Sequence, residues 1–194
     1  MPNRSFLSHL RGHHAAECLL DWTRRMNIAI GSAEGTAFPA SGCGFWICEV
    51  HPRQCNTCDY VKGTVGYLAP EYAMLGKASE SCDVYSFGVL LLELVSGKRP
   101  LEKVSATSKS PIAEWALPLV SERKLSEVAD PRLKGKYVEE ELKRVVLIAL
   151  VCTDNRPEKR PIMLEVVELL KRESKQKLSE LENNDLFKYP RFTV

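Results

Sequence analysis

The hydrophobic pattern of the chain centres on one nearly continuous apolar run. Val84–Val95 is apolar at almost every position, with Ser79 before it and Gly97 after it as typical helix start and stop residues. Pro100 follows shortly and cannot continue a helix. Because no face of this run is polar, the pattern predicts a buried central helix, which is too short to cross a bilayer.

The segment directly before this helix has a different composition. Gly63–Glu71 has the sequence GTVGYLAPE, which is too rich in glycine and proline for a helix or a strand ladder. The sequence therefore predicts an ordered loop that leads into the central helix.

Apolar residues at helical spacing predict further helices on both sides of this stretch. We expect a short turn at Ser5–Leu10, a helix from Asp21 to a stop at Gly35, and helices at Pro111–Val120, Val138–Cys152 and Ile162–Lys171. Leu125–Leu133 is expected to be a short turn, Asn155–Pro161 a loop, and the charged segment Glu173–Asn184 frayed and solvated. The pattern as a whole is all-helical.

Composition narrows the class of protein. A chain of 194 residues with 44% hydrophobic and 27% charged residues can form one soluble domain with a sizeable core. A net charge of +2 indicates no nucleic-acid-binding surface, and no signal peptide or membrane span is visible. Cys18, Cys82 and Cys152 lie in helical patterns, which predicts buried thiols and a reducing compartment.

Three motifs at fixed spacing resemble a known family. Ala69-Pro70-Glu71 is preceded by the Gly-Thr-x-Gly-Tyr pattern of residues 63–67 and followed by Asp83, Ser86 and Gly88 in a D-x-x-S-x-G pattern. This combination resembles the end of the activation segment and the following helix of a eukaryotic protein kinase. The amino-acid sequence of residues 1–37 and 61–187 most resembles that of plant receptor-like cytoplasmic kinases, in particular those named for interacting with the Pto kinase.

The resemblance implies a mainly α fold, the helical C-lobe of a protein kinase without its β-rich small lobe. Residues 1–37 would supply the first C-lobe helices and residues 61–172 the remainder. Residues 38–60 would be an irregular cysteine-rich insert in place of the catalytic loop and the D-F-G segment. Residues 173–194 would be a charged C-terminal tail.

The resemblance also implies roles for individual residues. The substrate-facing loop would comprise Thr64, Gly66, Tyr67, Ala69 and Pro70. Glu71 and Arg160 would form a structural ion pair, while Asp83 and Gly88 would anchor the central helix, Asp83 by accepting backbone hydrogen bonds from the catalytic loop. Thr64 and Tyr67 could be phosphorylated by another kinase, or be an ordinary loop threonine and a packed tyrosine.

The groups that perform phosphoryl transfer have no match in the sequence. The family supplies them as H-R-D-x-x-x-x-N, D-F-G and a small-lobe lysine, and its cofactors are ATP and magnesium. We therefore expect no catalysis and no bound cofactor. The implied role is a cytoplasmic scaffold or decoy, peripheral to the plasma membrane, for a protein partner that is a kinase or a kinase substrate. An enzyme completed by parts supplied in trans is the alternative.

The insert has a second interpretation as a metal site. Cys43, Cys48, Cys55 and Cys58 offer soft ligands for tetrahedral zinc, with His51 nearby. Only the Cys55-x2-Cys58 half has typical zinc spacing. Unrelated cysteines in an irregular loop are the other possibility.

The insert is also compatible with kinase coding sequence read in a neighbouring frame. Trp46 requires the codon TGG and Ile47 a codon that begins with A, so a shift of one base produces the glycine codon GGA. The two preceding shifted codons permit aspartate and phenylalanine, which would restore D-F-G. On this hypothesis the chain is the non-functional product of a mis-spliced kinase gene.

Overall fold

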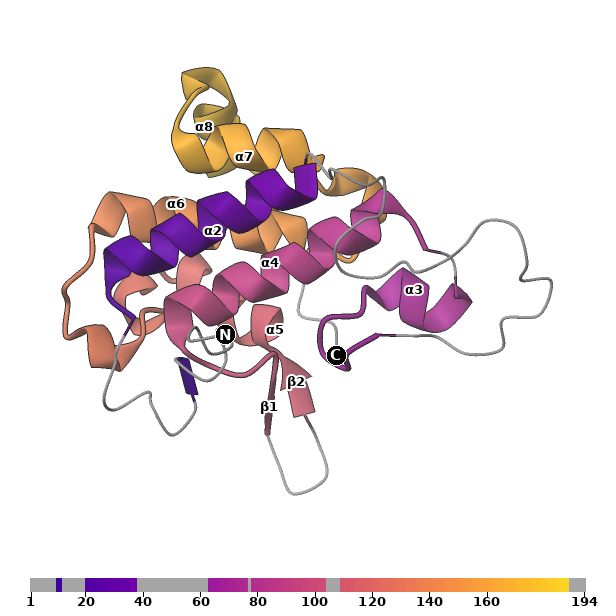
Figure 1. The fold of residues 1–194 in the computed structure, drawn as a ribbon, viewed down its shortest axis with the longest axis horizontal. Helices are drawn as coiled ribbons and strands as arrows, with labels where there is room; N and C mark the ends of the chain where they lie inside the picture. Colours follow the sequence, from indigo (N-terminus) through magenta and orange to yellow (C-terminus); the bar gives the residue numbers. More distant parts are fainter. Residues whose placement is uncertain (1–9, 12–19, 38–62, 77, 104–108, 189–194) are drawn as a thin grey trace, which may run out of the picture.

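The computed structural model describes residues 10–11, 20–37, 63–76, 78–103 and 109–188. The described residues are mainly helical, which confirms the predicted fold class (Figure 1). The α-helices are α2 (Trp22–Ala37), α3 (Pro70–Leu75), α4 (Glu80–Ser96), α5 (Ile112–Ser121), α6 (Glu139–Cys152), α7 (Met163–Lys171), α8 (Lys175–Glu182) and α9 (Asp185–Lys188). Strands β1 (Leu101–Lys103) and β2 (Lys109–Pro111) and the 3-10 turns η1 (Leu125–Glu127), η2 (Pro131–Leu133) and η3 (Pro157–Lys159) complete the elements.

Helix α4 lies at the centre of the fold, as its apolar pattern predicts. Every residue from Val84 to Ser96 is buried, and the helix packs along α6 and beside α2 (Figure 1). Gly88 permits the close approach to α6, because a Cβ atom there would lie 2.7 Å from Cβ of Cys152 and 2.8 Å from the carbonyl oxygen of Ala149. Ser79 precedes the helix and Gly97 ends it with a positive φ of 70°.

A buried arginine, unexpected from the pattern, ties α2 to the C-terminal end of α4. Arg25 is only 2% exposed, and its guanidinium donates to the carbonyl oxygens of Leu20 (2.9 Å) and Leu94 (2.8 Å). Its Nη2 lies 2.7 Å from Oδ2 of Asp130, whose carboxylate also accepts from Arg132. The two arginines therefore compensate one buried carboxylate and join three segments that are distant in sequence.

One expected boundary is wrong, because tertiary packing outweighs local preference. Helix α2 continues past Gly35 to Ala37, since Ala33 and Thr36 are buried on a helix that packs against α7. The predicted turn at Leu125–Leu133 consists of the two 3-10 turns η1 and η2, and the residues between them are buried.

Three helices, α3, α8 and α9, occur where none was expected. The predicted loop ends at Ala69 because Pro70 starts α3, where the missing N–H of a proline costs nothing. The charged segment Glu173–Asn184 contains α8, whose Leu181 is 6% exposed in the core. This segment is thus docked rather than frayed and solvated.

Strands β1 and β2 form a two-stranded antiparallel pair below α4 in Figure 1. Leu101 pairs with Pro111 and Glu102 with Ser110. Three-residue strands containing charged residues leave no alternating pattern, so the sequence did not predict them.

Candidate functional site: the loop from Gly63 to Pro70

Two glycines and one turn shape the loop before α3. Gly63 and Gly66 have φ values of 143° and 99°, which glycine adopts without strain. The Tyr67 N–H donates to the carbonyl oxygen of Thr64 at 3.0 Å and closes the turn. A Cβ atom on Gly66 would lie 2.9 Å from Cβ of Pro100, so the loop also depends on glycine for its close contact with the segment after α4.

Helix α4 holds the loop through the Ser86 hydroxyl, which is buried and donates to the carbonyl oxygen of Tyr67 at 2.7 Å. Two residues further on, Ala69 is fully buried. The loop backbone is therefore fixed against the central helix at its middle and at its end.

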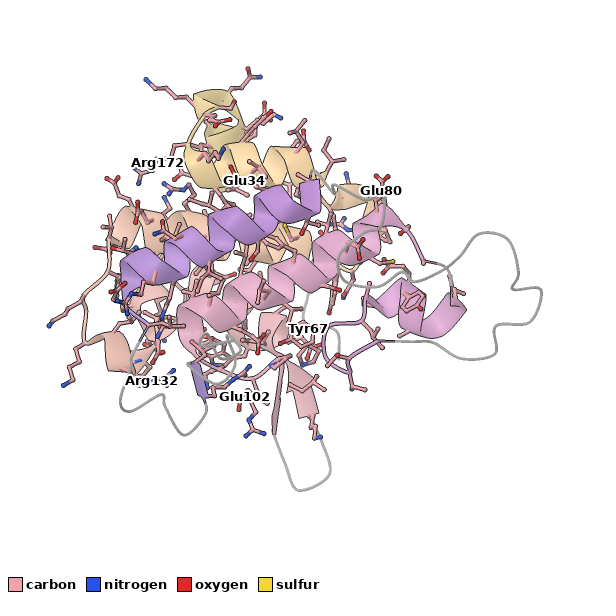
Figure 2. All side chains as sticks on the ribbon, in the orientation of Figure 1. Glu34, Tyr67, Glu80, Glu102, Arg132 and Arg172 are labelled. Carbon is pink, nitrogen blue, oxygen red and sulfur yellow. The ribbon has the colours of Figure 1, made fainter. Side chains whose placement is uncertain are left out.

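A buried acid on α4 anchors the Tyr67 side chain. Glu93 is 0% exposed, and its carboxylate accepts from the hydroxyl of Tyr67 and from the guanidinium of Arg11. Burial raises the pKa of Glu93, although Tyr67 and Arg11 act against the rise. Burial and the bond to Glu93 also raise the pKa of Tyr67 well above its ordinary value, so the phenol stays protonated and donates (Figure 2 labels Tyr67 below α4).

Glu71 and Arg160 lie together in a bidentate ion pair. Nη1 and Nη2 of Arg160 donate to Oε1 and Oε2 of Glu71 at 2.6 and 2.8 Å. The same guanidinium donates to the carbonyl oxygens of Ser81 (2.9 Å) and Asp154 (2.8 Å) and lies over the ring of Tyr85. Burial acts to raise the pKa of Glu71, but Arg160 holds it below its ordinary value, so the pair stays ionised.

Asp83 contrasts with these compensated acids. Its Oδ1 is buried and has no hydrogen-bond partner among the described residues. Burial, and to a smaller extent the charge of Glu80, raises the pKa of Asp83. The donors that the kinase resemblance implies for this residue would come from the catalytic loop, and residues 38–62 at that place in the chain lie outside the described residues.

Some of the other predicted residues belong to the described part of the chain and others do not. Thr64 is exposed at the loop surface, and Cys82 and Cys152 are buried. The proposed zinc ligands Cys43, Cys48, Cys55 and Cys58 lie outside the described residues, and no metal-binding cluster occurs among the residues that are described. Within the same described part, no helix is long and apolar enough to span a membrane.

Two residues that hold Tyr67, Glu93 and Arg11, are not among the site residues predicted from the sequence. The signal was present for Glu93, because it is the one charged residue within the run Val84–Val95. An acid in a buried helix requires a partner. No sequence pattern identifies Arg11 as that partner.

The anchored loop and α3 present large apolar side chains to solvent. Val65, Met74 and Leu75 are 75%, 83% and 67% exposed. We call these three residues the apolar face. Val65 lies in the loop and Met74 and Leu75 at the end of α3, and the contacts of Tyr67, Ser86 and Glu71 position the backbone of both segments.

A family model described as protein tyrosine and serine/threonine kinase matches residues 50–170. The chain belongs to this kinase family. A PTI1-like tyrosine-protein kinase of Arabidopsis thaliana is 47% identical over 98% of this chain and 60% of its own length. A putative proline-rich receptor-like protein kinase of the same plant is 34% identical over 94% of this chain and 29% of its own length.

A solved structure within the family also matches the described fold. The pseudokinase domain of BIR2, an immune regulator of the RLK/Pelle family, matches with a TM-score of 0.69 at 30% identity, over 96% of this chain and 63% of that domain. The chain thus spans less than two thirds of each of these three proteins. These matches confirm the resemblance to plant receptor-like kinases and their C-lobe.

Proposed function

We propose that this chain is a catalytically inactive kinase C-lobe that binds a protein partner through the apolar face. The observation that carries the proposal is the contrast between a firmly anchored loop backbone and the exposed Val65, Met74 and Leu75. A preorganised apolar surface loses little conformational entropy on binding and gains from burial.

Three observations support inactivity. The sequence contains no H-R-D-x-x-x-x-N or D-F-G motif, so it has no family group to position the nucleophile or hold magnesium. Oδ1 of Asp83, where the family receives its catalytic loop, has no partner among the described residues. The similar solved domain is itself described as a pseudokinase and an immune regulator.

The partner we propose is a kinase domain of the same receptor-like family or a substrate of such a kinase. In the family this loop faces the protein substrate, so a chain that retains the loop without the catalytic groups can act as a scaffold or decoy. The same proposal places the chain in the cytoplasm, peripheral to the plasma membrane, which fractionation of cells expressing the tagged chain would test.

A nucleotide-binding measurement tests inactivity. We expect no change in melting temperature when ATP and magnesium are added to the purified chain, and no phosphate transfer from labelled ATP to a general kinase substrate. A bound ligand at a hundredfold excess over its Kd would stabilise the fold by about 2.7 kcal/mol. A magnesium-dependent shift or measurable transfer would contradict the proposal.

A binding experiment tests the surface. The chain is titrated with a purified PTI1-like kinase domain, and Met74→Glu should weaken binding about tenfold or more, the usual effect at a central contact residue. Ile162→Glu is the matched control, since Ile162 is 58% exposed outside the apolar face. Equal affinity of the unsubstituted chain, Met74→Glu and Ile162→Glu for this kinase domain would exclude the apolar face as its binding surface.

A further inference from the structure

Arg144 on α6 is a buried cation whose guanidinium makes no hydrogen bond within the described part of the chain. It is 8% exposed and makes no hydrogen bond to any other described residue, and its Nε is inaccessible and without a partner. Its ion pair is with Glu141, at 3.9 Å from Nη2 to Oε1. A buried guanidinium is costly unless hydrogen bonds replace its hydration.

Glu141 cannot approach Arg144 without losing another bond. Its Oε2 accepts from the indole N–H of Trp22 at 2.8 Å. The carboxylate is therefore held by α2 at a distance too long for a hydrogen bond to Arg144. The described residues leave this cation incompletely compensated.

A second arginine, Arg172, contacts Glu140, the residue of α6 directly before Glu141. Burial lowers the pKa of Arg144, and the positive charge of Arg172 lowers it further. Arg172 follows α7 with a φ of 63°, and its Nη2 is 3.6 Å from Oε2 of Glu140. Glu140 is 86% exposed, so this contact is a solvated surface pair that a stronger anion can displace.

We propose that Arg144 and Arg172 form a binding site for an oxyanion of the phosphate type. A tetrahedral anion has enough acceptor oxygens to take hydrogen bonds from both guanidinium groups, whereas Glu140 and Glu141 supply contacts longer than hydrogen bonds. Figure 2 shows Arg172 on the opposite side of α4 from Tyr67, so the site is separate from the loop and the apolar face. The ligand is free phosphate or a phosphate monoester.

The test is a titration of the whole chain with inorganic phosphate at constant ionic strength, with chloride as the replaced anion, followed by the melting temperature. Phosphate should raise the melting temperature of the unsubstituted chain. Arg144→Gln should weaken binding about tenfold to a hundredfold, the range for loss of a charge-assisted hydrogen bond. The matched control is Lys143→Gln, which removes the same charge from the neighbouring residue, whose ammonium pairs with Glu182 at an exposed position.

A second readout separates this role from a structural one. In phosphate-free buffer, Arg144→Gln should melt no lower than the unsubstituted chain, because it removes a cation that lacks compensation. If Arg144→Gln does not fold, Arg172→Gln carries the test and should weaken phosphate binding while leaving the fold intact. The same titration with O-phosphoserine distinguishes the two ligands, because a site for phosphate monoesters binds O-phosphoserine and a site for free phosphate does not. Absence of phosphate binding, or equal binding by Arg144→Gln and Lys143→Gln, would overturn the proposal.

Discussion

The buried carboxylates at the two ends of helix α4 differ in whether other side chains compensate them. At the C-terminal end, Glu93 is compensated by Arg11 and Tyr67, and Asp130 by Arg25 and Arg132. At the N-terminal end, Oδ1 of Asp83 has no partner among the described residues. The buried charges at the C-terminal end are therefore compensated by described residues, whereas Oδ1 of Asp83 at the N-terminal end is not.

Glu71 belongs to the compensated group although it lies near the N-terminal end. Its partner Arg160 also donates to the carbonyl oxygen of Ser81 in the first turn of α4. The anchor of α3 is thus independent of Asp83. The contacts that hold the loop before α3 therefore do not depend on Asp83.

The largest test of this comparison is Asp130→Ala. Removing the carboxylate leaves Arg25, whose side chain is 2% exposed, as a buried unpaired cation. We expect a loss of about 4 kcal/mol in the free energy of unfolding, measured by urea denaturation. Glu122→Ala, at an exposed pair with Lys124, is the control and should leave the midpoint unchanged. A loss no greater than that of the control would mean that Arg25 is satisfied without Asp130.

Glu71→Gln should have the next largest effect. The amide retains the shape of the side chain but leaves the buried Arg160 without its anion, at a cost of about 3 kcal/mol in urea denaturation. Arg160→Lys should show an intermediate loss, because an ammonium keeps the charge but cannot make the bidentate contact. Two variants as stable as the unsubstituted chain would show that the pair does not anchor α3.

Tyr67→Phe should cost about 2 kcal/mol, the value for a hydrogen bond to a charged group. It removes only the hydroxyl that donates to Glu93 and leaves Arg11 as the remaining partner. Tyr72→Phe is the matched control, since the buried Tyr72 lies on α3 and makes no side-chain hydrogen bond to another described residue. Limited proteolysis within Gly63–Ala69 should also become faster in Tyr67→Phe alone, and equal rates in both variants would contradict the anchoring role.

Asp83→Asn should have the smallest effect and the opposite sign. The pKa of Asp83 is raised above its ordinary value of 3.8 in the folded state. Ionisation of this carboxyl group therefore destabilises the folded state as the pH rises above about 3.8. The variant should therefore equal the unsubstituted chain at about pH 3 and exceed it by about 1 kcal/mol at pH 7. A less stable variant at pH 7 would reveal a donor bound to the Asp83 carboxylate.

The contribution of Glu71 and Asp130 to the stability of the fold should depend on pH in the opposite direction. Their arginine partners hold both pKa values below the ordinary range in spite of burial, so their contribution is complete at neutral pH. It is lost only as pH falls below about 4, through the lowered values of the folded state. Melting curves of Glu71→Gln and the unsubstituted chain should converge in that acid range.

Local patterns in the sequence determined most of the helical framework. The apolar run of α4 with Ser79 and Gly97 at its ends, and the periodic patterns of α6 and α7, predicted these helices to within a residue or two. The spacing of Ala69-Pro70-Glu71 relative to Asp83 and Gly88 identified the kinase family. Such signals are local, because helix periodicity and end residues are encoded by neighbours in the chain.

Only the tertiary structure decided the partners of the buried charges. Arg25 lies 105 residues from Asp130, and Arg11 lies 82 residues from Glu93. No local pattern distinguishes Arg25 from the adjacent Arg24, which is exposed. The docking of α8 and the continuation of α2 past Gly35 depend likewise on surfaces supplied by other helices. Packing determines these features, since the free energy of burying a charge or an apolar side chain depends on which atoms surround it in the folded chain.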